Sequence, residues 1–113
     1  MDCLFCKVVK GEIKSSILYR DDWVIGIDDI NPQAPQHKLI IPYKHIATVN
    51  DLQAEDGELM GHMVLAAKTL AKQLNMAEQG YRLVLNCNEG AGQSVFHIHM
   101  HMLGGRRLRW PPG

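Results

Sequence analysis

The stretch of sequence that decides the fold is Val95-Phe96-His97-Ile98-His99-Met100-His101-Met102-Leu103. Apolar residues alternate with histidines along it, and alternate side chains of a β-strand point to opposite faces of the sheet. The pattern therefore predicts a strand over 95–103 that carries His97, His99 and His101 on one face. The other face would pack under a helix and carries Phe96, Ile98, Met100 and Met102.

Three of the six histidines of the chain fall within this short run. This concentration indicates a functional role for the histidines and not a chance recurrence on a solvent-facing strand. One interpretation is a catalytic metal site, since His-x-His supplies two ligands on one face and catalytic zinc takes three protein ligands plus water. The other is a nucleophile, because a neutral imidazole nitrogen can attack phosphorus or an acyl carbon. The Cα atoms of neighbouring histidines in this strand would lie about 7 Å apart, so the three side chains cannot converge on one ion without groups from other segments.

The turn before the histidines favours the nucleophile. Gly90, Gly92, Gln93 and Ser94 offer backbone amides and a hydroxyl, and a glycine-bearing turn lets the backbone approach and cradle a phosphate. A zinc hydrolase is disfavoured because no Asp or Glu lies close to the row in sequence to serve as its base, although a distant residue could.

Composition excludes several classes of protein. The chain has 113 residues and 12.7 kDa, which fits one domain over 1–113. Twelve basic residues balance twelve acidic ones, which argues against nucleic acid as the main partner. No apolar run approaches the roughly 20 residues of a membrane span. The N-terminus lacks the basic and apolar blocks of a signal peptide. Three cysteines cannot form a fully paired disulfide framework. We therefore expect a cytoplasmic protein.

The remaining elements follow from periodicity and turn signals. A long apolar stripe at helical spacing predicts a helix over about 55–75, and 3–10 is predicted as a short helix that stops at Gly11. Short apolar runs bounded by turn residues predict the strands. These are 17–20, 24–27, 38–42, 81–87 and 95–103. The order α-β-β-β-α-β-β indicates an antiparallel sheet with the helices on one face, in the α+β class.

Residues 93–105 resemble the defining motif of the histidine triad family, His-φ-His-φ-His-φ-φ, where φ is apolar. Segments 29–37 and 110–113 look like the nucleotide-binding Hint branch of that family, so the resemblance covers nearly the whole chain. It implies an α+β HIT-like fold with a five-stranded antiparallel sheet, one long helix and one short helix. It also implies a homodimer in which the two sheets join into one continuous sheet.

The resemblance implies a purine nucleoside phosphoramidase or acyl-nucleotide hydrolase acting on AMP or GMP conjugates; no residue distinguishes the two bases. His99 would attack the α-phosphorus, and water would then cleave the nucleotidyl-histidine without any cofactor. Ser94 would protonate the leaving amine and His37 would face His99 across the pocket. Asp29 would hold the ribose hydroxyls, with Ile30 at the nucleoside. The implied phosphate site comprises Asn86, Gly92, Gln93, Ser94 and His101.

A second implied site involves Cys3-x-x-Cys6, whose two sulfurs share one helix face. Taken alone, the pair is equally compatible with redox activity or simple burial. Some bacterial-type members of the family carry a zinc site, and the resemblance implies that the ligands here would be Cys3, Cys6, His45 and His97. A Cys₂His₂ set closes a tetrahedral site, so this zinc would be structural.

A different class of function is a nucleotide-binding interaction module whose turnover is incidental. The complete row of His97, His99 and His101, together with Ser94, favours an enzyme, because a pure binding protein has no need of a nucleophile.

Overall fold

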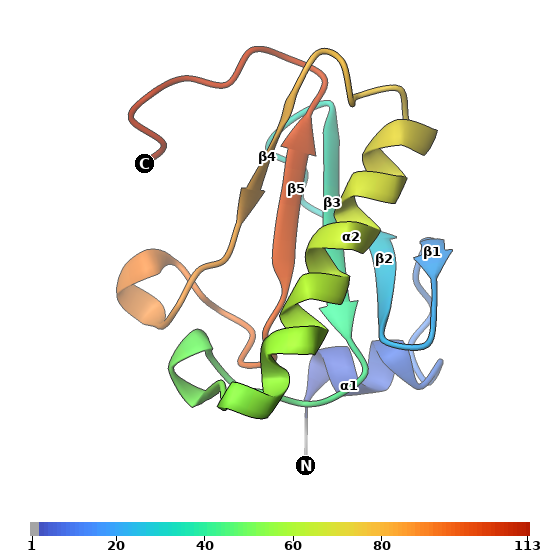
Figure 1. Ribbon diagram of the computed structural model, residues 1–113, viewed down its shortest axis with the longest axis vertical. Coiled ribbons are helices and arrows are strands. Elements are labelled where there is room, and N and C mark those ends of the chain that lie inside the picture. Colours follow the sequence, from blue (N-terminus) through green and yellow to red (C-terminus); the bar gives the residue numbers. More distant parts are fainter. Residues whose placement is uncertain (1–2) are drawn as a thin grey trace.

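The computed structural model describes residues 3–113 and contains one antiparallel sheet in the order β1-β2-β3-β5-β4. Figure 1 shows the long helix α2 lying across this sheet, with the short helix α1 at one end. The two helices and five strands are α1 (Leu4–Val9), β1 (Ile17–Arg20), β2 (Val24–Asp28), β3 (Gln36–Pro42), α2 (Gly57–Gln73), β4 (Tyr81–Val84) and β5 (Met100–Gly104). The predicted five-stranded antiparallel α+β architecture is confirmed.

The two helices lie on opposite faces of the sheet, so the prediction of helices on one face was wrong. The apolar stripe of α2 packs on Val24, Ile40 and Met102. Residues of α1 instead form a second cluster with Ile25, Ile27, Leu39 and Ile41. The reason is that β2 and β3 are apolar at both alternating positions and buried along almost their whole length, so each face needs a cover.

The close approach of α2 to the sheet depends on Gly26 in β2. A Cβ at this position would lie 3.3 Å from Leu70 of α2 and 3.2 Å from the Cβ of Tyr19. Such separations are tighter than ordinary van der Waals contact, so a larger residue would push the helix away from the strand.

The histidine run departs from the predicted strand. β5 begins only at Met100, and residues 95–99 are irregular. In that segment the backbone N–H of Ile98 donates to the carbonyl of Ile46, 2.6 Å away, instead of to a neighbouring strand. The expectation that Phe96 packs under the helix was wrong, since this residue is 46% exposed. The other three apolar residues of that face do join the α2 core, namely Ile98, Met100 and Met102.

Candidate active site

A cavity of about 730 Å³ opens on the α1 side of the sheet. Its walls come from α1, from the segment after Gly11, from the loop after β2 and from the segment that precedes β5. Seven of the predicted substrate residues line it, namely Asp29, Ile30, Asn86, Gly92, Ser94, His99 and His101. Two do not, Gln93 and His37, and both are buried behind the wall.

His99 holds a nitrogen lone pair in this cavity. A carbonyl oxygen can only accept, so the contact of 2.8 Å between His99 Nδ1 and the His97 carbonyl places the proton on Nδ1. The Nε2 atom is then unprotonated in the neutral ring. Burial lowers the pKa of His99 below its ordinary 6.5, which keeps the ring neutral at pH 7. This arrangement suits a nucleophile, because its lone pair is available without prior loss of a proton.

His101 and His37 form a chain of donors with a defined direction. The backbone N–H of Gln33 donates to His37 Nδ1 at 3.0 Å, so the proton of neutral His37 sits on Nε2. That Nε2–H donates to His101 Nδ1 at 2.9 Å, which leaves the proton of His101 on its own Nε2. His37 therefore contacts His101, whereas the resemblance had implied that it would face His99.

The pKa of His101 is lowered to about 4 by burial, with further lowering from His99 and His37. Burial also lowers the pKa of His37. Oδ2 of Asp29 lies 3.3 Å from His37 Nε2 and 3.9 Å from His101 Nδ1. Both histidines are thus neutral at pH 7, and His101 offers an N–H rather than a full positive charge.

The cluster of Asp29, His37 and His101 has the residue types of a metal site. Its hydrogen bonds do not fit one. An imidazole cannot accept from the Gln33 amide at Nδ1 and bind an ion through Nε2 unless both nitrogens are deprotonated. The two facing nitrogens, 2.9 Å apart, are also closer than the roughly 3.3 Å between two imidazole ligands of one tetrahedral ion. We interpret this cluster as a hydrogen-bonded relay.

The turn before the histidines is organised by Gln93. The backbone N–H of Asn88 donates to its Oε1 at 2.8 Å, and its Nε2 donates to the carbonyls of Ala47 and Val95 at 2.8 and 3.1 Å. The backbone amides of Gly92 and Gln93 also donate within this turn, so they are engaged and do not cradle an anion as the sequence had suggested. Ser94 follows directly and is exposed to the cavity.

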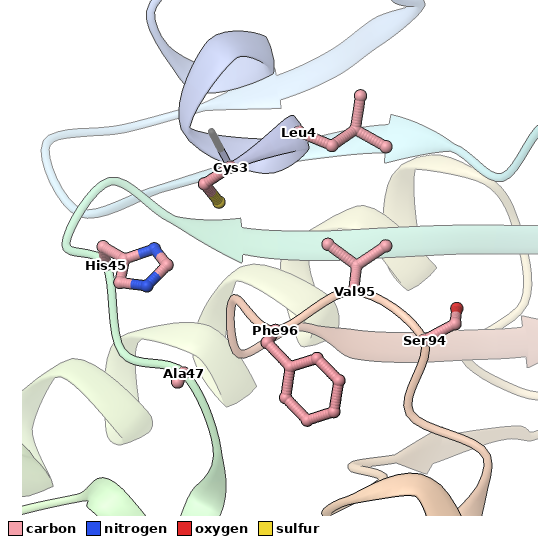
Figure 2. Close-up of a pocket in the computed structure, with 7 residues that line it drawn as sticks. All are labelled: Cys3, Leu4, His45, Ala47, Ser94, Val95 and Phe96. Carbon is pink, nitrogen blue, oxygen red and sulfur yellow. The ribbon is translucent and has the colours of Figure 1, made fainter. Parts of the chain in front are cut away.

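Four potential metal ligands converge at the start of α1, with all ligand atoms within 4.8 Å of one another, namely Cys3, Cys6, His45 and His97. Nδ1 of His97 lies 3.3 Å from Cys3 Sγ, 3.5 Å from Cys6 Sγ and 3.2 Å from His45 Nδ1. Figure 2 shows Cys3 at the start of α1 and His45 on the loop after β3. Both residues line a second cavity of about 500 Å³.

This cluster fits a tetrahedral metal. With bonds of about 2.0–2.3 Å, the ligand atoms of tetrahedral zinc stand about 3.3–3.8 Å apart, close to the separations observed. His97 Nε2 donates to the Pro42 carbonyl at 2.8 Å, which leaves Nδ1 unprotonated and free to bind an ion. Burial raises the pKa of Cys6, so a cation would stabilise the thiolate that the protein alone disfavours. The cluster could therefore bind a metal such as zinc.

Sequence reasoning missed several residues of the cavity. Phe5 and Val8 belong to α1 and Leu39 to β3, and all three form its apolar wall. The apolar run in 38–42 is continuous and gives no sign of which face carries Leu39. Ser15 also lines the cavity, and its Oγ is buried without a hydrogen-bond partner among the residues described; no sequence signal indicates it.

Comparisons with known proteins identify the family. A family model described as "Scavenger mRNA decapping enzyme C-term binding" matches residues 2–107. The crystal structure of a HIT family hydrolase from Legionella pneumophila superposes with a TM-score of 0.97 at 52% identity, covering 99% of this chain and 100% of that one. A histidine triad nucleotide-binding protein from Candida albicans gives a TM-score of 0.83 at 31% identity, covering 97% and 83%. The chain belongs to the histidine triad family.

Among curated proteins, the purine nucleoside phosphoramidase of Escherichia coli K12 is 50% identical over 107 residues, which are 95% of this chain and 90% of that protein. This relative lies in the Hint branch that the resemblance had indicated. No helix within residues 3–113 is long and apolar enough to cross a membrane.

The lowered histidine pKa values predict how stability depends on pH. The folded protein disfavours the imidazolium, whereas the unfolded chain takes up protons below about 6.5. The free energy of unfolding should therefore decrease as the pH falls below 6.5, until the folded groups titrate, near 4 for His101. Urea unfolding at several pH values between 7.5 and 5 measures this. His101→Gln should reduce the slope, and an unchanged slope would contradict the assignment.

Proposed function

We propose that the protein is a purine nucleoside phosphoramidase that hydrolyses nucleoside 5′-phosphoramidates and acyl-nucleotides through a covalent nucleotidyl-histidine. The observation that carries the proposal is the hydrogen bond from His99 Nδ1 to the His97 carbonyl. It leaves Nε2 with a lone pair in a cavity that also contains the polar groups of Ser94 and His101. The 50% identity to the E. coli phosphoramidase supports the same activity.

The proposed reaction has two steps. His99 Nε2 attacks the α-phosphorus, a phosphorus–nitrogen bond to the histidine forms, and the bond to the leaving amine breaks. Ser94 supplies a proton to that amine, and the Nε2–H of His101 donates to the phosphate oxygens as negative charge develops. Water then attacks the phosphorus and gives a proton back to Ser94, the bond to His99 breaks, and the nucleoside monophosphate leaves. An acyl-nucleotide follows the same path and releases a carboxylate.

Two regions of the cavity suit a bound nucleoside, one for the purine ring and one for the ribose. The apolar wall of Phe5, Val8 and Leu39 can accept a purine ring. Asp29 lines the cavity with a side chain only 15% exposed. Its Oδ1 accepts from the Asn31 backbone at 2.8 Å, which orients the carboxylate for the ribose hydroxyls. Ile30 is fully exposed at the rim, where a bound nucleoside could cover it.

Hydrolysis of adenosine 5′-phosphoramidate tests this function. We expect the purified protein to release AMP and ammonia, and to retain this activity when no metal is added to the assay. Binding of AMP without any release of product from the phosphoramidate or from an acyl-adenylate would contradict the proposal and favour a nucleotide-binding module.

Asp29→Asn should weaken binding of the ribose, because a hydrogen bond to a charged group contributes about 1.5–3 kcal/mol. We expect KM for the ribose substrate to increase roughly tenfold or more. A 2′,3′-dideoxy substrate lacks the hydroxyls, so its KM should be the same for the variant and the wild type. Equal increases in KM for the two substrates would show that Asp29 does not bind the ribose hydroxyls and acts by another route, for example through His37.

We also propose that the four-residue cluster holds a structural zinc ion. Cys3 and Cys6 would supply thiolates, and His45 and His97 would supply imidazole nitrogens, which closes the coordination sphere. When bound, zinc would cross-link α1 to the loop after β3 and to the segment before β5.

We propose that the protein forms a homodimer along the β4 edge of the sheet. β1 and β4 are the two edge strands of the described sheet, and an unpaired strand edge is a template for another strand. Val64 and Leu65 on α2 are 47% and 56% exposed, and Leu85 beyond β4 is also exposed. We expect sedimentation to give twice the chain mass, and Leu65→Glu to lower it to one; a monomeric wild type would contradict the dimer.

A further inference from the structure

Four consecutive residues at the start of α1 supply both thiols of the proposed metal site and part of the cavity wall. The metal cluster here means the set of Cys3, Cys6, His45 and His97. Cys3 caps the helix, Cys6 lies one turn later, and Phe5 stands between them. Isolated helices of six residues do not form in water, so tertiary contacts fix the position of α1. Those contacts include the apolar cluster with β2 and β3 and the contacts of Cys3 and Cys6 with His45 and His97.

Phe5 connects α1 to the proposed nucleophile. Its ring meets the His99 ring edge to face, with centroids 4.9 Å apart and an interplanar angle of 87°. Phe5 is buried, with a residue exposure of 7%, and the centroid of its ring also lies 6.2 Å from that of His97. The edge-to-face contact restricts rotation of the imidazole about its side-chain bonds, so the direction of His99 Nε2 depends on where α1 holds Phe5.

His97 provides a second connection between the cluster and His99. Its ring belongs to the metal cluster through Nδ1, and Nε2 is tied to the Pro42 carbonyl. Its backbone carbonyl accepts the proton of His99 Nδ1. One residue thus contributes a ligand atom to the cluster and the acceptor that fixes the tautomer of the nucleophile.

We propose that Phe5 is a positioning residue for His99 and that metal binding at Cys3, Cys6, His45 and His97 holds it in place, so that the metal cluster is coupled to the active site. This inference rests on the proposed function of His99 and of the cluster. Without the ion, the contacts described among the four side chains are one imidazole pair and thiol–imidazole contacts of 3.3–3.5 Å, in which sulfur is a weak hydrogen-bonding partner. The position of α1 then depends more heavily on its apolar contacts with β2 and β3.

Two consequences are expected on removal of the metal. The first is local: amide protons of α1 should exchange with solvent at least about tenfold faster, while those of α2, which packs on the opposite face, remain protected. The second is at the nucleophile: the Nδ1–H signal of His99 in nitrogen-15 NMR should broaden or vanish as its acceptor and its aromatic neighbour become mobile. We expect kcat to fall ten- to hundredfold, the usual effect of losing a supporting contact.

The experiment compares zinc-loaded and chelated protein, with circular dichroism to confirm that each sample is folded. It includes Phe5→Leu, which keeps an apolar side chain but removes the ring, and Val9→Ala as a matched control. Val9 is equally buried in α1 and packs in the same cluster. In zinc-loaded protein, Phe5→Leu should lower kcat and broaden the His99 signal at unchanged zinc content, and Val9→Ala should change neither.

The coupling is contradicted if folded, chelated protein keeps the protection of α1, a sharp His99 signal and a kcat within twofold of the loaded form. It is also contradicted if Phe5→Leu and Val9→Ala have the same effect. If zinc-loaded wild type does not hydrolyse the phosphoramidate, the proposed function fails, whereas amide exchange and the His99 signal still decide the coupling.

Discussion

Replacement of His99 by alanine is expected to lower kcat for adenosine 5′-phosphoramidate by at least about 10⁴-fold, since the nucleophile is lost while the cavity remains. The fold should survive, because His99 is only partly buried and its hydrogen bond to the His97 carbonyl lies within the local backbone. AMP should still bind, since Asp29 and the apolar wall are unchanged. Kinetics and AMP titration measure the two effects separately.

His99→Asn serves as a second variant, because its amide can still donate to the His97 carbonyl but cannot form a nucleotidyl intermediate. We expect it to be as inactive as His99→Ala. A variant that retained more than about one hundredth of the wild-type kcat would show that another group attacks phosphorus. His62→Ala is the matched control, since His62 lies on α2 and stacks on Trp23 with ring centroids 4.4 Å apart, away from the cavity.

Zinc is expected to raise the midpoint of thermal unfolding by roughly 15 °C. A ligand at a thousand times its Kd stabilises the folded state by about 4 kcal/mol, and 1 kcal/mol corresponds to a few degrees in a chain of this length. His45→Ala should abolish most of this shift, because it removes one of four ligands. His62→Ala should retain it. Scanning calorimetry with and without a chelator measures the difference.

A zinc content near one ion per chain in wild type and far less in His45→Ala would accompany that result. A wild type whose unfolding midpoint is the same with zinc and with chelator would contradict a structural metal at this site.

Local pattern predicted most of the fold. β1 was located without error, and β2, β3 and α2 within two residues at each end, since each has a clear period and a turn at its limits. β4 was expected to reach Cys87 and ends at Val84. The largest error in length was in 95–103, where alternation suggested one strand. The cluster of His97 with Cys3, Cys6 and His45, and the bond from Ile98 to Ile46, hold that segment out of the sheet.

The site was predicted less completely because its geometry depends on contacts between distant segments. The donor chain from His37 to His101 follows from strand register: Leu39 pairs with His101 and His37 with Leu103, which makes the two histidines diagonal neighbours. Periodicity could not show that α1 covers the histidine side, or that Phe5 meets His99. Nor could it show that the amides of the glycine turn are already engaged.

The most direct test of the central claim is to quench a single turnover of adenosine 5′-phosphoramidate and measure the intact mass of the protein. We predict a species heavier by one adenylyl group, which peptide mapping places on His99, and its absence in His99→Asn. Turnover without any adenylylated species at millisecond quench times, or an adenylyl group on another residue, would contradict the account.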